Sequence, residues 1–170
     1  CNPLEVELQN FSHGASAALP YNWSYGDGDE STSLDIIHGH TFNNFSHTEV
    51  KEFEITLNAF SSFGCKSEIT KTVKVYPVPD AVFNTSIQAA CSPAEVQYTN
   101  SSSGANSYSW TFGDGGSANS IQAAHVYNNP ANNPPAQYQT KLIATNQYGC
   151  QDSLVKNLTI FPDIEAAFEM

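Results

Sequence analysis

The chain is poor in basic side chains and in long apolar runs, and both shortages exclude classes of function. Lysine and arginine together number 6 against 17 aspartate and glutamate residues, which gives a net charge of −11. A surface of this sign repels phosphate backbones, so we expect no nucleic-acid binding. No apolar run approaches the roughly 20 residues that a membrane helix needs, so we expect no membrane span in this segment.

The sequence also lacks a helical hydrophobic period and any arrangement typical of a catalytic site. Serine is plentiful, but no serine lies in a nucleophile elbow and no histidine spacing suggests a catalytic triad. We therefore expect no catalytic residue, no enzyme activity and no bound cofactor in this segment.

An internal repeat is the most informative feature that is present. Trp23–Gly28 (WSYGDG) recurs as Trp110–Gly115 (WTFGDG), and Cys1–Ser12 aligns without a gap with Cys91–Ser102. A repeat of this size makes the chain an array of modules, so function is to be sought on modular surfaces.

The alignment also gives the domain boundaries that we expect. Asp80–Phe83 recurs as Glu165–Phe168, so a third copy begins at about residue 164 and is cut off at Met170. We predict a module over 1–77 that lacks its first strand, a second module over 78–163, and the first strand of a third repeat over 164–170. The sequence is then an excerpt from a longer array.

Alternation of apolar and polar residues with period two predicts that both modules are all-β. About seven short strands in roughly 85 residues, with a tryptophan on a middle strand, is the pattern of an immunoglobulin-like sandwich. Trp23 and Trp110 are therefore expected in the cores rather than on the surface as platforms for sugar stacking. The alternating segments are Val6/Leu8, Phe53/Ile55/Leu57, Val73/Val75, Val96/Tyr98, Tyr138/Thr140/Leu142 and Leu158/Ile160.

These motifs resemble those of the PKD (polycystic kidney disease) repeat. In both copies Trp-x-Phe/Tyr-Gly-Asp-Gly is followed by His-x-Phe/Tyr, an aromatic-x-x-x-Leu strand and an Asn/Ser-x-Phe/Tyr-Gly turn. The Cys-x-Pro/Leu opening and the Gly-Cys turn are similar to copies in large surface and secreted proteins of gliding Bacteroidota. The resemblance implies two tandem immunoglobulin-like (PKD-type) β-sandwiches arranged end to end, and an extracellular, secreted or cell-surface-attached protein.

The first Gly-Asp-Gly turn contains the calcium candidates of the sequence, Asp27, Asp29 and Glu30, because carboxylates and turn carbonyls suit calcium. The alternative is a hairpin turn in which glycine supplies positive φ and the aspartate bonds its own turn backbone. Some PKD modules beside collagenases resemble this one and bind calcium through acidic residues in the loop before the tryptophan. That loop carries no carboxylate in His13–Ser16 or Ser103–Asn106, so we expect a structural turn and no metal.

Two histidines on one strand, His38 and His40, offer half of a zinc site. His40 recurs as His125, whereas His38 has no counterpart and no third ligand is evident. We expect the repeating histidine to form a hydrogen bond within the sandwich edge.

Four cysteines at repeat-equivalent positions, Cys1, Cys65, Cys91 and Cys150, indicate disulfide chemistry in a non-cytosolic protein. One pairing lies within modules, Cys1–Cys65 and Cys91–Cys150. In an immunoglobulin-like sandwich those points lie some 20 Å apart, whereas a disulfide needs Cα atoms within roughly 7 Å. The other pairing, Cys1–Cys150, crosses the junction of an end-to-end array. The sequence leaves both pairings open.

The leading functional hypothesis is a non-enzymatic spacer segment of a large extracellular bacterial adhesin or surface fibre. Short proline-containing junctions, Tyr76–Asp80 and Phe161–Asp163, favour a stiff, disulfide-stabilised rod. The expected partners are neighbouring PKD-like modules of the same chain, surface polysaccharide or protein, and laterally associated copies.

The alternative hypothesis is a carbohydrate- or protein-binding module, including one that is accessory to a secreted hydrolase. Its candidate contact regions are the loops Phe60–Phe63 and Asn146–Tyr148 and the insertion Asn128–Ala136.

Overall fold

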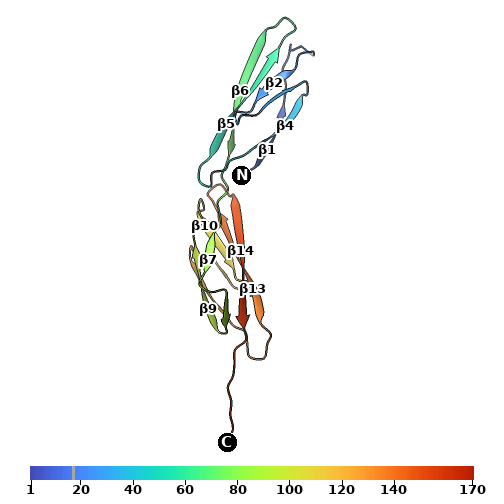
Figure 1. Ribbon diagram of the computed structural model, residues 1–170. Helices are drawn as coiled ribbons and strands as arrows, with labels where there is room; N and C mark the ends of the chain where they lie inside the picture. Colours follow the sequence, from blue (N-terminus) through green and yellow to red (C-terminus); the bar gives the residue numbers. More distant parts are fainter. Residues whose placement is uncertain (17) are drawn as a thin grey trace. The chain divides into compact units, whose positions relative to one another are not determined.

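The computed structural model describes residues 1–16 and 18–170, and these residues form strands but no helix. None of them therefore provides a helix that could cross a membrane. The strands belong to two compact units (Figure 1), unit 1 (Cys1–Pro77) and unit 2 (Val78–Met170). Each unit has its own apolar core. The prediction of an all-β sandwich fold is confirmed.

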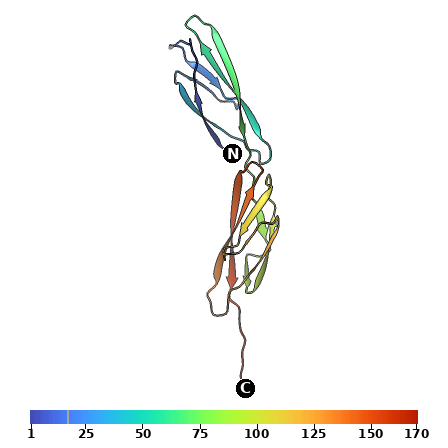
Figure 2. The same cartoon turned by 180° about the vertical axis from the view of Figure 1, so that it is seen from behind.

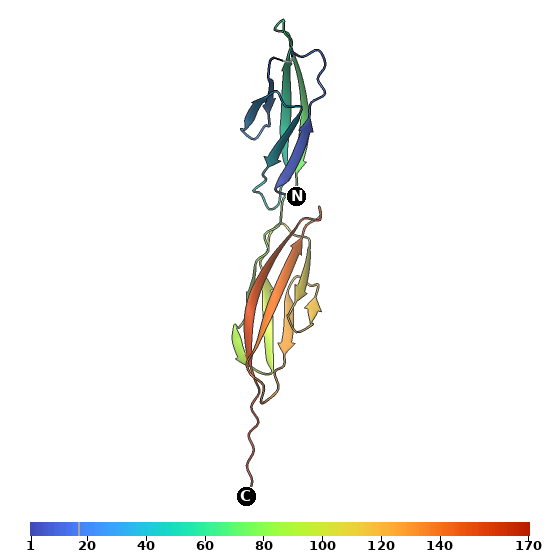
Figure 3. The same ribbon diagram turned by 90° about the vertical axis from the view of Figure 1, so that its right-hand side faces the viewer.

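Unit 1 contains two antiparallel sheets (Figure 3). The smaller sheet pairs β1 with β4, and the larger sheet has the order β3-β2-β5-β6. The strand bounds are β1 Leu4–Gln9, β2 Tyr21–Ser24, β3 Glu30–Ser33, β4 Ile37–Phe42, β5 Lys51–Phe60 and β6 Lys66–Val75.

Unit 2 also contains two sheets, of order β12-β9-β7 and β11-β10-β13-β14-β8 (Figure 2). All pairings are antiparallel except that of β8 with β14. The strand bounds are β7 Phe83–Thr85, β8 Ala89–Cys91, β9 Ala94–Asn100, β10 Ser107–Thr111, β11 Ser117–Ala118, β12 Ala123–Tyr127, β13 Ala136–Thr145 and β14 Gln151–Phe161.

The two units pair their corresponding strands in the same register. Val6 lies opposite His40 in unit 1, and the aligned residues Val96 and His125 lie opposite each other in unit 2. The same agreement holds for Trp23/Leu57 with Trp110/Leu142, and for Ile55/Lys71 with Thr140/Lys156. Strands β1 to β6 therefore correspond to β9 to β14. Among the described residues, β7 and β8 have no counterpart in unit 1.

Both tryptophans lie in the cores, as the sequence predicted: Trp110 is 0% exposed and Trp23 is 6% exposed. The core of unit 2 also holds three hydroxyls. The Tyr98 hydroxyl lies 2.7 Å from that of Tyr127 and 2.9 Å from that of Thr140. Burial raises the pKa of both tyrosines above the ordinary value of 10.0, so both stay neutral at physiological pH. The aligned residues of unit 1 are Leu8, Phe42 and Ile55, so the same contacts there are apolar.

The first glycine of each Gly-Asp-Gly turn lies against a neighbouring strand. A Cβ added to Gly113, which has φ of +87°, would lie 2.8 Å from the backbone nitrogen and oxygen of Gln139 in β13. Gly115 has φ of +97°, but no atom lies within 4 Å of its added Cβ. The two glycines thus have the same backbone requirement and different surroundings.

We expect Gly113→Ala to destabilise unit 2 by about 1–3 kcal/mol more than Gly115→Ala. Both variants carry the cost of a positive φ, roughly 1–2 kcal/mol, but only Gly113→Ala must displace β13. Urea unfolding followed by the fluorescence of Trp110, in a Trp23→Phe background, measures both losses. Equal losses would contradict the close approach.

Candidate functional site

Each unit contains an aspartate–histidine pair that joins its two sheets. Asp27 Oδ2 lies 2.7 Å from His40 Nε2 in unit 1, and Asp114 Oδ2 lies 2.6 Å from His125 Nε2 in unit 2. The histidine lies on β4 or β12 of the smaller sheet, and the aspartate lies in the turn after β2 or β10 of the larger sheet. We call this pair the Asp–His clasp.

The other carboxylate oxygen of each clasp orders its own turn. Asp27 Oδ1 accepts a hydrogen bond of 3.1 Å from the backbone N–H of Asp29, and Asp114 Oδ1 accepts one of 2.9 Å from that of Gly116. The prediction that the aspartate bonds its own turn backbone is confirmed, as is the prediction that the repeating histidine bonds within the sandwich.

Aromatic rings hold each clasp histidine in place. The ring of His40 stacks on Tyr25, with centroids 3.8 Å apart and planes at 3°, and meets Phe42 edge-on at 4.6 Å. His125 makes the same two contacts with Phe112 and Tyr127, at 4.2 and 4.7 Å. The imidazole therefore has a fixed plane, which aims Nε2 at the carboxylate.

The clasp changes the acidity of its carboxyl group. Burial raises the pKa of Asp27 and of Asp114. Hydrogen bonds from the histidine and from the turn backbone, together with the charge of the histidine, lower the pKa by more than burial raises it. The net result is a pKa below the ordinary value of 3.8 for both carboxyls. Both side chains are thus carboxylates at neutral pH.

The clasp of unit 1 belongs to a group of three potential metal ligands. The ligand atoms of Asp27, Asp29 and His40 lie within 4.8 Å of one another, whereas Glu30 is not part of this group. Calcium prefers six to eight oxygen ligands, so two carboxylates and an imidazole suit it poorly. Unit 2 has Gly116 at the position of Asp29 and keeps the same turn, so the turn does not depend on a metal.

His38, the other half of the zinc hypothesis, packs against aromatic rings. Its ring lies 6.0 Å from that of Tyr25 and 6.4 Å from that of Trp23, stacked on both. It is not in the group of potential ligands found among residues 1–16 and 18–170. The structure therefore places His38 beside the core of unit 1 rather than with a third ligand.

The cysteines differ in oxidation state. Cys1 and Cys150 are disulfide-bonded, whereas Cys65 and Cys91 have free, exposed thiols. The sequence left two pairings open, and the pairing within modules (Cys1–Cys65 and Cys91–Cys150) is wrong. Each of its two bonds would include Cys65 or Cys91, and the structure shows both of these as free thiols.

The topology of unit 2 explains why Cys91 and Cys150 do not bond. Cys91 lies opposite Phe161, the last residue of β14, whereas Cys150 directly precedes Gln151, its first residue. A strand of 11 residues spans roughly 35 Å, far beyond the roughly 7 Å that a disulfide tolerates between Cα atoms.

A pair of buried asparagines was missed by the sequence reading. Asn44 Nδ2 donates to the carbonyls of Glu49 and Val75, both at 2.8 Å, and joins the loop before β5 to the end of β6. Asn129 makes the same two bonds in unit 2, at 3.0 and 2.9 Å. The sequence could have revealed them, because aligned positions 44 and 129 both hold asparagine.

Comparison with known proteins gives a family match and several structural neighbours. A family model described as "PKD domain" matches residues 74–161. None of the curated proteins matches the chain.

The solved structures that are similar to this chain include two from Vibrio. The PKD1 domain of Vibrio anguillarum Epp is 20% identical with a TM-score of 0.41, and the match covers 51% of this chain and 96% of that chain. The PKD1 domain from Vibrio cholerae metalloprotease PrtV is 23% identical with a TM-score of 0.40, covering 49% of this chain and 96% of that chain. Fibronectin(III)-like modules of Clostridium thermocellum CbhA are 12% identical with a TM-score of 0.37, covering 98% and 90%.

We expect both clasps to weaken in acid. A carboxyl whose pKa is lowered by folding stabilises the folded unit above its unfolded pKa, near 3.8, and this contribution is lost as the pH falls through the lower folded pKa. Asp114→Asn should cost unit 2 about 1–3 kcal/mol at pH 7 and flatten its stability profile below pH 3.8. Urea unfolding over a pH series measures this. The control is Glu95→Gln, which removes a carboxyl of unit 2 that lies outside the clasp. A profile unchanged by Asp114→Asn would contradict the role of the clasp.

We expect calcium to have no effect on the stability of unit 1. Three ligand atoms, one of them a nitrogen, are too few to replace the hydration shell of the ion. Thermal unfolding with millimolar calcium and with a chelator should give the same melting temperature. If calcium raised the melting temperature and Asp29→Asn abolished that increase, unit 1 would contain a calcium site.

Proposed function

Because the chain belongs to the PKD domain family, we propose that it is a non-enzymatic spacer segment of a large extracellular bacterial adhesin or surface fibre. The observation that carries the proposal is repetition: both units have the same clasp and the same strand registers. In each unit the aspartate and the histidine connect the two sheets, so both side chains have a structural role.

Unit 1 is, in this proposal, a second PKD-type module, and Glu165–Phe168 begins a third. The support is the alignment of Trp23–Gly28 with Trp110–Gly115 and of Asp80–Phe83 with Glu165–Phe168. The chain is then part of an array of the kind found in surface and secreted proteins of Bacteroidota, and its neighbours are modules of the same type.

The proposed array is stiff because its modules are joined closely. The junction Tyr76–Asp80 is short and contains two prolines, which restrict its backbone. We further propose a disulfide from Cys1 to Cys150 across the junction, which the oxidised state of these two cysteines supports. Cys91 would bond in the same way to the following module and Cys65 to the preceding one. Such bonds persist in an oxidising, extracellular setting.

Peptide mapping without reduction tests this connectivity. After alkylation and digestion of the chain, we expect one linked pair of peptides, containing Cys1 and Cys150, and alkylated Cys65 and Cys91. The matched variants are Cys1→Ser, which should release Cys150, and Cys65→Ser, which should leave the linked pair unchanged. A linked pair that contains Cys65 or Cys91 would contradict the proposal.

Small-angle scattering tests the stiffness. We expect Cys1→Ser to broaden the distribution of distances in the 170-residue chain relative to Cys65→Ser, because only Cys1→Ser removes the proposed junction bond. A wild-type chain whose scattering already fits freely jointed units would contradict the spacer function.

The second candidate function is direct binding of polysaccharide or protein, which includes a role beside a secreted hydrolase. It is favoured by exposed aromatic rings, above all Phe63, which is 92% exposed in the turn between β5 and β6. A glycan array on which the wild-type chain binds and Phe63→Ala does not would support this function over the spacer function.

A further inference from the structure

Three side chains of unit 1, which we call the ligand group, bring metal-binding atoms together from both sheets. Asp27 and Asp29 lie on the turn between β2 and β3 of the larger sheet, and His40 lies on β4 of the smaller sheet. Their ligand atoms all lie within 4.8 Å of one another. Two donors bound to one zinc ion lie roughly 3–4 Å apart, since each lies about 2.0–2.2 Å from the metal. Small side-chain rotations would therefore let the three residues share one ion.

The backbone directs position 29 at the clasp histidine, as unit 2 shows. Gly116 is the counterpart of Asp29, and a Cβ added to it would lie 2.5 Å from Cε1 and 3.1 Å from Nε2 of His125. A side chain at this position thus starts beside the imidazole. In unit 1 it carries a carboxylate, and none of the residues 1–16 and 18–170 forms a hydrogen bond or an ion pair with that carboxylate. The carboxylate of Asp29 is therefore available to a cation.

The nitrogen ligand of the group has a fixed direction. Tyr25 and Phe42 hold the plane of the His40 ring, and Nε2 of that ring lies 2.7 Å from Asp27 Oδ2. A neutral imidazole binds a metal through the nitrogen that carries no proton, so His40 would keep its proton on Nδ1. The ion would then replace the hydrogen bond of the clasp and join the same two sheets.

A buried hydroxyl beside the ligand group has no hydrogen-bond partner. Tyr25 is 2% exposed, and its phenol oxygen is a buried polar atom without a partner among the described residues. Burial raises the pKa of Tyr25, the nearby Ser31 hydroxyl lowers it, and the charges of Asp27 and Asp29 raise it, so the phenol oxygen lies within electrostatic range of both carboxylates. The counterpart of Tyr25 in unit 2 is Phe112, which has no hydroxyl. The Tyr25 hydroxyl can bond a water on the ion or a carboxylate that binds the ion.

The types of donor favour a transition metal over calcium. Two carboxylate oxygens and one imidazole nitrogen are ligands that zinc accepts, with water in a fourth position. The two carboxylates also balance the charge of a divalent cation, and the net charge of the chain, −11, attracts cations.

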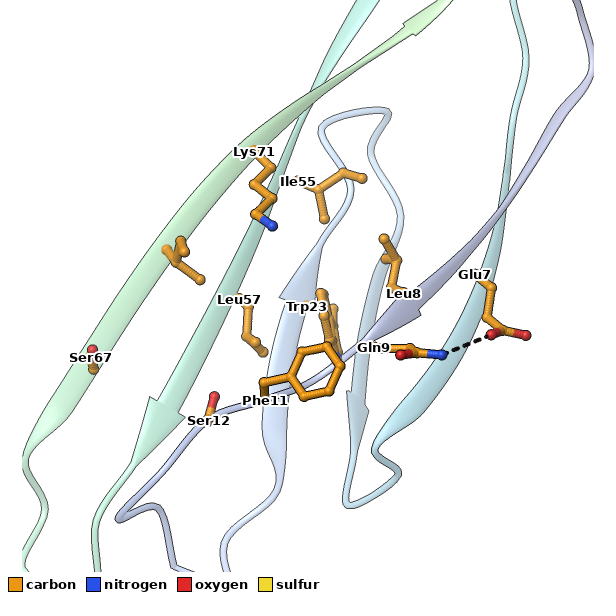
Figure 4. Close-up of a pocket in the computed structure, with 11 residues that line it drawn as sticks. Glu7, Leu8, Gln9, Phe11, Ser12, Trp23, Ile55, Leu57, Ser67 and Lys71 are labelled. Carbon is orange, nitrogen blue, oxygen red and sulfur yellow. Dashed lines mark hydrogen bonds between the residues drawn. The ribbon is translucent and has the colours of Figure 1, made fainter.

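The apolar groove of unit 1, of about 630 Å³, lacks such a set of ligands (Figure 4). Glu7 supplies the one carboxylate among the residues that line it, and this carboxylate accepts a hydrogen bond of 3.3 Å from Gln9 Nε2. The ammonium of Lys71 also lines the groove and repels cations. In the part of the chain that the structure describes, the ligand group is thus the one place where three such ligands meet.

We propose that Asp27, Asp29 and His40 of unit 1 bind one zinc ion, with water in the fourth position. The ion links the turn of the larger sheet to β4 of the smaller sheet and so strengthens the contact that the clasp makes without metal. Unit 2 binds no zinc in this way, because Gly116 supplies no ligand. This inference goes beyond the spacer function, which a metal-free chain would also perform.

Zinc titration of the full 170-residue chain, followed by the NMR signals of its histidine rings, tests the proposal. The background is Cys65→Ser/Cys91→Ser, so that free thiols do not bind the metal. We expect saturable binding of one ion that shifts the ring signals of His40 and leaves those of His125 unchanged. Zinc at about 100 times its dissociation constant should lower the unfolding equilibrium constant of unit 1 about 100-fold, measured on the His40 signals during urea unfolding.

Two substitutions test the ligand group itself. Asp29→Asn should weaken zinc binding by roughly 100-fold, and Tyr25→Phe by roughly 10-fold. Unit 2 keeps its turn and its stacked histidine with Gly116 and Phe112 at these positions, so neither change should unfold unit 1. Glu30→Gln is the matched control, since Glu30 follows Asp29 in the chain but is not part of the ligand group, and it should leave binding unchanged.

Three results would overturn the proposal. The first is a titration without saturable zinc binding. The second is binding that Asp29→Asn leaves intact, because the ion would then lie on other histidines or on the clasp alone. The third is a shift of the His125 signals equal to that of the His40 signals, because an aspartate–histidine pair would then suffice without a third ligand.

Discussion

A histidine from one sheet that meets an aspartate from the other holds each sandwich in register. The contact depends on several local features at once: the positive φ of the turn glycines, the backbone N–H that orients the carboxylate, and the aromatic rings that fix the imidazole plane. The clasp histidines stack on Tyr25 and Phe112, which belong to the apolar cores between the sheets, so the clasp adjoins the core in each unit. The core and the clasp therefore support each other.

The two units reach the same arrangement with different core chemistry. Tyr98, Tyr127 and Thr140 share hydrogen bonds in unit 2, where Leu8, Phe42 and Ile55 pack without any. Either set leaves no buried hydroxyl among these positions without a partner, so both are compatible with the fold. Each hydroxyl of unit 2 lies within hydrogen-bond distance of the other two, so the loss of one would still leave the remaining pair bonded to each other.

Much of the fold could be predicted from the sequence because it depends on local pattern. Period-two alternation predicted the strands, and the recurring Trp and Gly-Asp-Gly motifs predicted the buried indoles and the self-bonded turns. What could not be predicted depends on contacts between distant segments. Asp29 groups with His40 rather than with Glu30 because β4 lies beside the turn, and Asn44 is buried because a loop folds over the end of β6. The exposure of Ile69 likewise follows from the neighbours that β6 has, which alternation along the strand does not reveal.

The parallel pairing of β8 with β14 has a mechanical consequence for unit 2. Strand β8 lies near the beginning of the unit and β14 near its end, and Ala89–Cys91 lies beside Thr159–Phe161. Tension applied to the two ends of the unit would draw these strands past each other in opposite directions. The backbone bonds from Thr159 to Gln88 and from Ser92 to Phe161 would then bear the load in shear, together rather than one after another. Rupture would require several bonds to break at once, so this short pairing is the part of unit 2 best arranged to resist extension.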